Sequence, residues 1–154
     1  MKHDHIRDYW ELQGEKHGAS HWASWGDNWM IDLEIETIAE FINDGDKVLD
    51  VGCANGFGVF RQAESHQRLS IMGVDFAAKM IDAAQKVKQE KSLGADVEFR
   101  EGDVRSLEFP DNVFDLVYTT RVLINLPTWE LQVQGIAECV RVVKPGGTVV
   151  LSEG

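Results

Sequence analysis

Three acidic residues, each at the end of a short apolar run, have the types and spacing to bind a polar ligand. They are Asp50, Asp75 and Asp103. A carboxylate there can accept both hydroxyls of a ribose or the hydrogens of an amino group. Taken singly, such an Asp also suits a turn. Three of them after successive strands predict one crevice with acceptors for an amino acid, a sugar and an adenine edge.

A run of small residues follows Asp50 and fits a strand-to-helix turn that a ligand can approach closely. Gly52, Ala54 and Gly56 are small, whereas the dinucleotide pattern G-x-G-x-x-G would need a small residue at the position of Phe57. Asp50 would repel a pyrophosphate, but it would attract an ammonium or sulfonium at about 1.5–3 kcal/mol per charge-assisted bond. The turn therefore favours a cationic ligand, and a purely structural tight turn is the alternative.

The elements that position these residues alternate between strands and helices. Apolar runs and helical periodicity predict helices over 29–41, 56–65, 77–92 and 128–143, strands over 48–51, 70–75, 97–101, 114–118 and 148–151, and a sharp break at 144–147. Strands separated by helices pair in parallel. The predicted fold class is an α/β, doubly wound, mostly parallel open sheet, with its ligand site at the carboxyl ends of the strands.

Composition narrows the classes of protein. The chain has 154 residues and a formal net charge of −11, so clustered phosphate contacts are disfavoured and no nucleic-acid partner is expected. Cys53 and Cys139 lack the spacing of a metal knuckle or a disulfide framework. Two free thiols, the absence of a long apolar run and a polar N-terminus predict a cytoplasmic protein with no membrane partner and no metal.

Four segments then carry a resemblance to a known family. The runs VLDVGCANG, GVDFAAKMI, EGDVRSLEFPDNVFDLVYTTRVLINL and RVVKPGGTVVLSE resemble, in this order, the class I S-adenosylmethionine-dependent methyltransferases. The resemblance covers residues 47–153. It implies an S-adenosylmethionine-binding α/β core over 47–154, preceded by a helical and aromatic lid segment over 1–46.

The resemblance also implies roles for matching positions. Around the methionine part of S-adenosylmethionine it places Asp50, Gly52, Cys53, Asn55 and Gly56, with Thr120 and Arg121 reaching the same end and facing the acceptor. Around the adenosine part it places Asp75 on the ribose diol, Phe76 and Met80 against the adenine, and Asp103 and Val104 at its edge.

Two departures from the family pattern stand out. Position 54 is Ala where the family usually has Gly, which is tolerable if its φ stays negative. The chain also stops at the fifth strand, whereas the family usually has two more that complete the sheet. A truncated chain is the favoured interpretation, and a homodimer that covers the exposed edge is the alternative.

The leading segment holds most of the large aromatic residues. Aromatic faces there attract a sulfonium, so an acceptor lid is expected, with simple packing of a leading helix as the alternative. The aromatic residues in question are Tyr9, Trp10, Trp22, Trp25 and Trp29. The acidic stretch Asp32, Glu34 and Glu36 is expected to be a solvated helix face.

The predicted function is methyl transfer from S-adenosylmethionine to a small-molecule acceptor by in-line displacement, with the protein binding and orienting the reactants. No catalytic residue is assigned, although His17, His21 and Tyr9 are candidates if a general base is needed. Two alternatives are a non-catalytic module that binds S-adenosylmethionine or a nucleoside, and a nicotinamide-dependent oxidoreductase.

Overall fold

A five-stranded parallel sheet forms the centre of the computed structural model, which describes residues 3–23 and 26–154. Its strands follow the order β3-β2-β1-β4-β5. The elements are α1 His3–His17, η1 His21–Ala23, α2 Asn28–Ala39, β1 Lys47–Val51, α3 Phe57–Ser65, β2 Ser70–Asp75, α4 Ala78–Glu90, β3 Asp96–Glu101, β4 Phe114–Thr120, η2 Leu123–Asn125, α5 Trp129–Val142 and β5 Val143–Ser152. The predicted fold class is confirmed.

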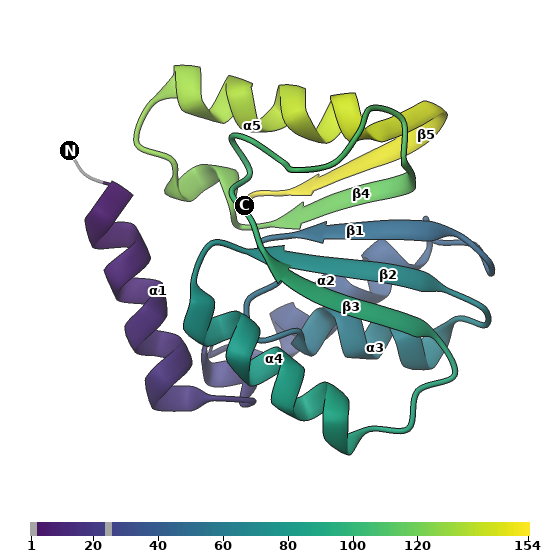
Figure 1. Cartoon of the computed structure of the whole chain (residues 1–154), viewed down its shortest axis with the longest axis horizontal. Helices are drawn as coiled ribbons and strands as arrows, with labels where there is room; N and C mark the ends of the chain where they lie inside the picture. Colours follow the sequence, from purple (N-terminus) through teal and green to yellow (C-terminus); the bar gives the residue numbers. More distant parts are fainter. Residues whose placement is uncertain (1–2, 24–25) are drawn as a thin grey trace.

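Both faces of the sheet are covered, which explains why its central strands have no polar face. Alternate residues of β1 enter two separate cores, because successive side chains of a strand point to opposite sides. Val48 packs with residues of α2, α3 and α4, and Leu49 packs with residues of α5. Figure 1 shows α5 on one side of the sheet and α2, α3 and α4 on the other.

The strand order reverses between β1 and β4, because β1, β2 and β3 run toward one edge and β4 and β5 toward the other. At such a switch point the carboxyl ends of parallel strands leave a crevice for a ligand. In Figure 1 the strand arrows point toward the side of the molecule on which α1 lies. The N-terminal helix therefore stands beside the end of the sheet where a ligand is expected.

The N-terminal helix is held by polar contacts as well as by packing. Residues 3–17 show little apolar periodicity, yet they form α1 against α4. Glu11 accepts hydrogen bonds from the N–H groups of Ala78 and Lys79, both at 2.8 Å, and so caps the first turn of α4 from another element. The residue at the N-cap position of α4, Ala77, has no side chain that can do this.

The expected break at 144–147 lies inside a strand. β5 begins at Val143, which pairs with Phe114, and resumes regular pairing where Thr148 meets Leu116. Four residues of β5 thus lie opposite one residue of β4, as in an enlarged β-bulge. Gly146 has a φ of +79°, a conformation that glycine adopts without strain. The Lys-Pro-Gly-Gly sequence therefore bends β5 without ending it.

Candidate functional site

The loop after β1 is shaped by left-handed backbone. Gly52, Ala54 and Gly56 have φ values of +80°, +48° and +80°. A Cβ at position 52 would lie 2.2 Å from Cγ2 of Val122, so only glycine fits there. The condition expected for Ala54, a negative φ, is not met. Its N–H donates to Asp75 at 2.9 Å, and this bond helps to hold the alanine in a conformation that costs strain.

Asp75, at the end of β2, organises this loop and lies beside it. One carboxylate oxygen accepts the N–H of Ala54 and the other accepts the N–H of Ala77, both at 2.9 Å. Burial raises the pKa of Asp75 to about 6, although these two hydrogen bonds oppose the rise. Each oxygen keeps a second lone pair. The carboxylate can therefore fix the loop and still accept hydroxyl groups from a ligand.

Asp50, on β1, is the second buried carboxylate. The hydroxyl of Tyr118, on β4, donates to it at 2.9 Å. Burial raises the pKa of Asp50 to about 7, and the nearby charge of Asp75 adds to the rise while the Tyr118 bond opposes it. Both acids would ionise more readily beside a cation, so this part of the site is suited to a positively charged group.

Asp103, after β3, is held by a residue that the sequence analysis did not single out. It accepts the backbone N–H and the guanidinium of Arg105. The Asp103 carboxylate thus already forms an ion pair with Arg105. The adjacent Val104 is buried at the same strand end. A role of Asp103 and Val104 at an adenine edge remains a prediction.

An ion pair closes the site beyond β4. Arg121, with a φ of +52°, forms an ion pair with Glu34 of α2, and Glu34 also accepts the hydroxyl of Ser152 at 3.0 Å. Glu34 is therefore no part of a solvated helix face, which corrects the expectation for residues 32–36. Asp32 is also paired, with Arg61 at 3.0 Å, whereas Glu36 is exposed. Alternating acids in a helix do not reveal which one meets a distant arginine.

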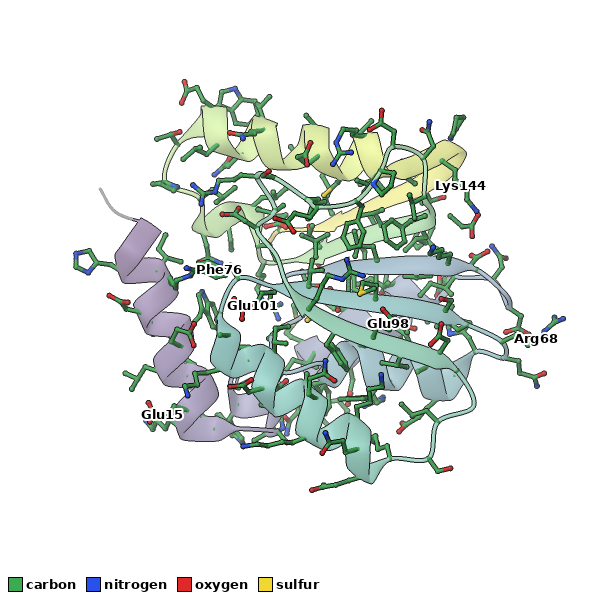
Figure 2. The ribbon with its side chains drawn as sticks, viewed as in Figure 1. Glu15, Arg68, Phe76, Glu98, Glu101 and Lys144 are labelled. Atoms are coloured by element: carbon green, nitrogen blue, oxygen red, sulfur yellow. The ribbon has the colours of Figure 1, made fainter. Side chains whose placement is uncertain are left out.

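These strand ends enclose a cavity of about 530 Å³, within the range of ordinary ligand pockets. Ten predicted site residues lie on its wall: Asp50, Gly52, Cys53, Asn55, Asp75, Phe76, Asp103, Val104, Thr120 and Arg121. Figure 2 shows Phe76 at the end of the sheet near α1, far from Arg68 and Lys144. The strand-end acids and the family resemblance together thus identified about a third of the residues that line this cavity.

Two predicted residues do not line the cavity. Met80 is fully buried and packs with Ala23 and Ala77, so the expected contact with an adenine has no exposed surface to form it. The periodicity of α4 could not distinguish its core face from a ligand-binding face. Gly56 lies behind the loop, where a Cβ would meet the ring of Phe99 at 2.7 Å. Gly56 is instead the N-cap residue of α3.

The leading segment contributes to the wall in part. Tyr9 and Trp10 line the cavity, together with Ile6. Trp22 and Trp29 are largely exposed, and Trp25 lies outside the described residues. Of the three candidate bases, Tyr9 lines the cavity and His17 and His21 do not. Asn55 ties the segment to the loop by donating to the carbonyl oxygens of Gly18 and Ser20, both at 2.7 Å.

Other chemistries find little support in the described parts of the chain. Burial raises the pKa of the Cys53 thiol well above its usual range, which disfavours a reactive thiolate. Over residues 3–23 and 26–154, no group of three or more His, Cys, Asp or Glu side chains is arranged to hold a metal. Among the same residues, no helix is both long enough and apolar enough to cross a membrane.

Comparison with known proteins places this site in a family. Residues 48–147 match the family model described as a methyltransferase domain. The chain is 38% identical over 107 residues to a sterol 24-C-methyltransferase of Gibberella zeae, and 32% identical over 124 residues to phosphoethanolamine N-methyltransferase 3 of Arabidopsis thaliana. These alignments cover 69% and 77% of this chain. The chain belongs to the class I S-adenosylmethionine-dependent methyltransferase family, as the sequence motifs predicted.

Solved structures agree on the fold. A crystal structure of an S-adenosylmethionine-dependent methyltransferase from Methanosarcina mazei is similar with a TM-score of 0.69 and 28% identity, over 75% of this chain and 55% of that chain. The cyclase SpnF is similar with a TM-score of 0.71 and 30% identity, over 77% of this chain and 43% of that chain. The chain spans about a quarter of the length of the two methyltransferases compared by sequence.

Proposed function

We propose that this chain binds S-adenosylmethionine at the carboxyl ends of β1, β2 and β4, as the binding core of a methyltransferase. The observation that carries the proposal is the pair of buried carboxylates, Asp50 and Asp75, on neighbouring strands beside one cavity at the switch point of the sheet. One carboxylate suits a cation and the other suits a sugar diol, which are the two polar features of this cofactor.

The described residues fit the cofactor in outline. Gly52 lets the loop pack against Val122 beside the cavity, and Asp75 has lone pairs to spare for the ribose hydroxyls. Phe76 offers an aromatic face near the nucleoside end, and Tyr9 and Trp10 offer two more on α1. When bound, S-adenosylmethionine supplies an electrophilic methyl group. The residues of this chain hold it in place and limit its contact with water.

The acceptor that we propose is a small organic molecule. Support comes from the apolar cavity wall formed by Ile31, Ile35 and Ile38 of α2, and from the shortage of basic groups for a nucleic acid. Two relatives are named for small acceptors, a sterol and phosphoethanolamine. We further propose that residues 1–46 act as a lid, supported by the contacts of Glu11 and Asn55.

We also propose that the protein forms a homodimer and that it lies in the cytoplasm. β5 forms one edge of the described sheet and carries Leu151, which is exposed. A second copy that pairs along this edge would cover it. Cys53 and Cys139 are both free and buried, which supports a reducing compartment such as the cytoplasm.

Calorimetric titration with S-adenosylhomocysteine, the demethylated product, tests the cofactor proposal. We expect saturable binding, and at about 100 times Kd a stabilisation of about 2.7 kcal/mol in the free energy of unfolding. NADH is the matched control, because an oxidoreductase on this sheet would bind it instead. No binding of S-adenosylhomocysteine would refute the proposal.

A second candidate function is a different reaction, or none, on the same fold. The similarity to the cyclase SpnF supports this candidate, because proteins with the same fold can carry out different reactions. Transfer of an isotopically labelled methyl group to a panel of amines, hydroxyl compounds and sterols distinguishes the candidates. Cofactor binding without transfer to any acceptor would support the second one.

A further inference from the structure

A buried amide on α3 has one polar atom that the fold does not use. Gln62 is 1% exposed and lies on the cavity wall. Its Nε2 donates to the carbonyl oxygen of Ile35, on α2, at 2.8 Å. Its Oε1 is buried and has no donor among the described residues. A buried acceptor without a donor destabilises the protein, so it requires an explanation.

The orientation of this amide is fixed by its partner. The carbonyl oxygen of Ile35 can only accept, and a reversed amide would bring two oxygens together. A role limited to joining α2 and α3 uses Nε2 alone and gives Oε1 no function. The oxygen therefore remains available to a donor that enters the cavity.

The position of Gln62 along the sheet indicates which part of a ligand it meets. Asp75 and Phe76 follow β2, so the nucleoside end belongs on the β2 and β3 side. Asp50 lies on β1 and Tyr118 on β4, and α3 begins directly after the β1 loop. Gln62, Asp50 and Tyr118 line the same cavity, and Gly58, one turn before Gln62 on α3, faces Asp50, since a Cβ there would lie 3.9 Å from its Oδ2. A ligand that spans the strand ends brings its amino-acid end to them.

We propose that Oε1 of Gln62 and the carboxylate of Asp50 together receive the ammonium group of the cofactor. This inference rests on the proposed function and adds a binding residue that neither the motifs nor the family resemblance assigned. Both atoms accept hydrogen bonds, and an ammonium has three hydrogens to donate. The ligand's own carboxylate, which can only accept, is excluded from this position.

The test pairs a change in the protein with a change in the ligand. Titration of the wild-type chain and of Gln62→Leu uses S-adenosylhomocysteine and its analogue with hydrogen in place of the amino group. We expect the wild type to bind the parent compound about 10- to 100-fold more tightly than the analogue, as for a charged hydrogen bond. In Gln62→Leu this preference should shrink by about tenfold, and affinity for the analogue should stay near the wild-type value.

His66→Ala is the matched control. Its ring nitrogens contact the carbonyl oxygen of Ala39 and the backbone carbonyl oxygen of Gln62, but not the Gln62 amide, and the ring lies away from the cavity wall. Its loss should leave the preference for the amino group unchanged. Gln62→Met serves as a second variant if the leucine variant does not fold.

Three outcomes would overturn the inference. In the first, the wild type binds both ligands with equal affinity. In the second, the Gln62 variants lose the same amount of affinity for both ligands, and in the third they lose no affinity for either. Each of these requires that the wild type binds S-adenosylhomocysteine. Absence of that binding would instead refute the proposed function, so the two failures are distinguishable.

Discussion

We propose that Asp75 both holds the backbone and accepts the ribose hydroxyls. Its two oxygens accept the N–H groups of Ala54 and Ala77. In Asp75→Asn one of those N–H groups would face an amide NH₂. We expect a loss of about 1–3 kcal/mol in the free energy of unfolding. We also expect S-adenosylhomocysteine to bind at least about tenfold more weakly, since each 1.4 kcal/mol is a factor of ten.

Urea unfolding and calorimetry measure these two effects. Asp96→Asn makes the same chemical change at the exposed start of β3, away from the cavity, and should alter neither quantity. Unchanged stability and affinity in Asp75→Asn would show that the carboxylate charge is needed for neither the loop nor the ligand.

The raised pKa of Asp50 makes the stability of the ligand-free protein depend on pH. In the unfolded chain this carboxyl ionises near its ordinary value of 3.8, but in the fold it keeps its proton up to about pH 7. Its contribution to stability is therefore complete below the ordinary value and is lost as the pH rises to about 7. The loss is about 2–4 kcal/mol. Asp75 adds a loss of the same sign that ends near pH 6.

Urea unfolding of wild type and Asp50→Asn across this pH range isolates the effect. The variant should lose less stability than the wild type as the pH rises, because its amide does not titrate. A cationic ligand favours the ionised carboxylate, so affinity for S-adenosylhomocysteine should increase up to about pH 7 and then level off. Parallel curves for the two proteins would contradict the assignment.

At the scale of elements, the contact of α1 with α4 determines whether the leading segment stays over the cavity. Glu11→Gln removes the charge and one acceptor from the start of α4. We expect a loss of about 1–2 kcal/mol, as for a helix cap placed at the positive end of the helix dipole. Hydrogen exchange should become faster in α1 and in the first turn of α4, and should stay unchanged in β1 and β4.

Glu15→Gln is the control for this prediction. Glu15 lies on the same helix and is exposed, and Figure 2 shows it on the outer side of α1. Faster exchange throughout the sheet would show that Glu11 supports the whole fold. Unchanged exchange in α1 would contradict a role of Glu11 in holding the proposed lid.

The elements differ in how far the sequence predicted them, and the reason is physical. Apolar runs such as Val48-Leu49 are buried on both faces, so their composition alone identifies strands. Parallel pairing then brings the acids at the strand ends to the same edge of the sheet. The role of Glu34 depends on Arg121, 87 positions away, and the burial of Met80 depends on where α1 packs. Long-range contacts of this kind leave no local pattern.

For the whole molecule, the homodimer that we propose would pair along the outer edge of β5. Leu151→Lys places a charge on that edge and should shift the protein toward a monomer in sedimentation velocity. Val140→Lys changes an exposed position on α5, away from that edge, and should leave the distribution of species unchanged. A wild-type protein that is monomeric at every concentration would refute the proposed homodimer.

Asp75 accepts one backbone hydrogen bond from the loop after β1 and one from the start of α4, and this has an evolutionary consequence. Because this carboxylate maintains the shape of the chain after β1, selection for folding alone would preserve it in descendants that had abandoned the cofactor. An aspartate at this strand end is therefore a poor criterion for separating active members of the family from inactive ones. Side-chain atoms that the fold does not use, such as Oε1 of Gln62, are the better place to look for that difference.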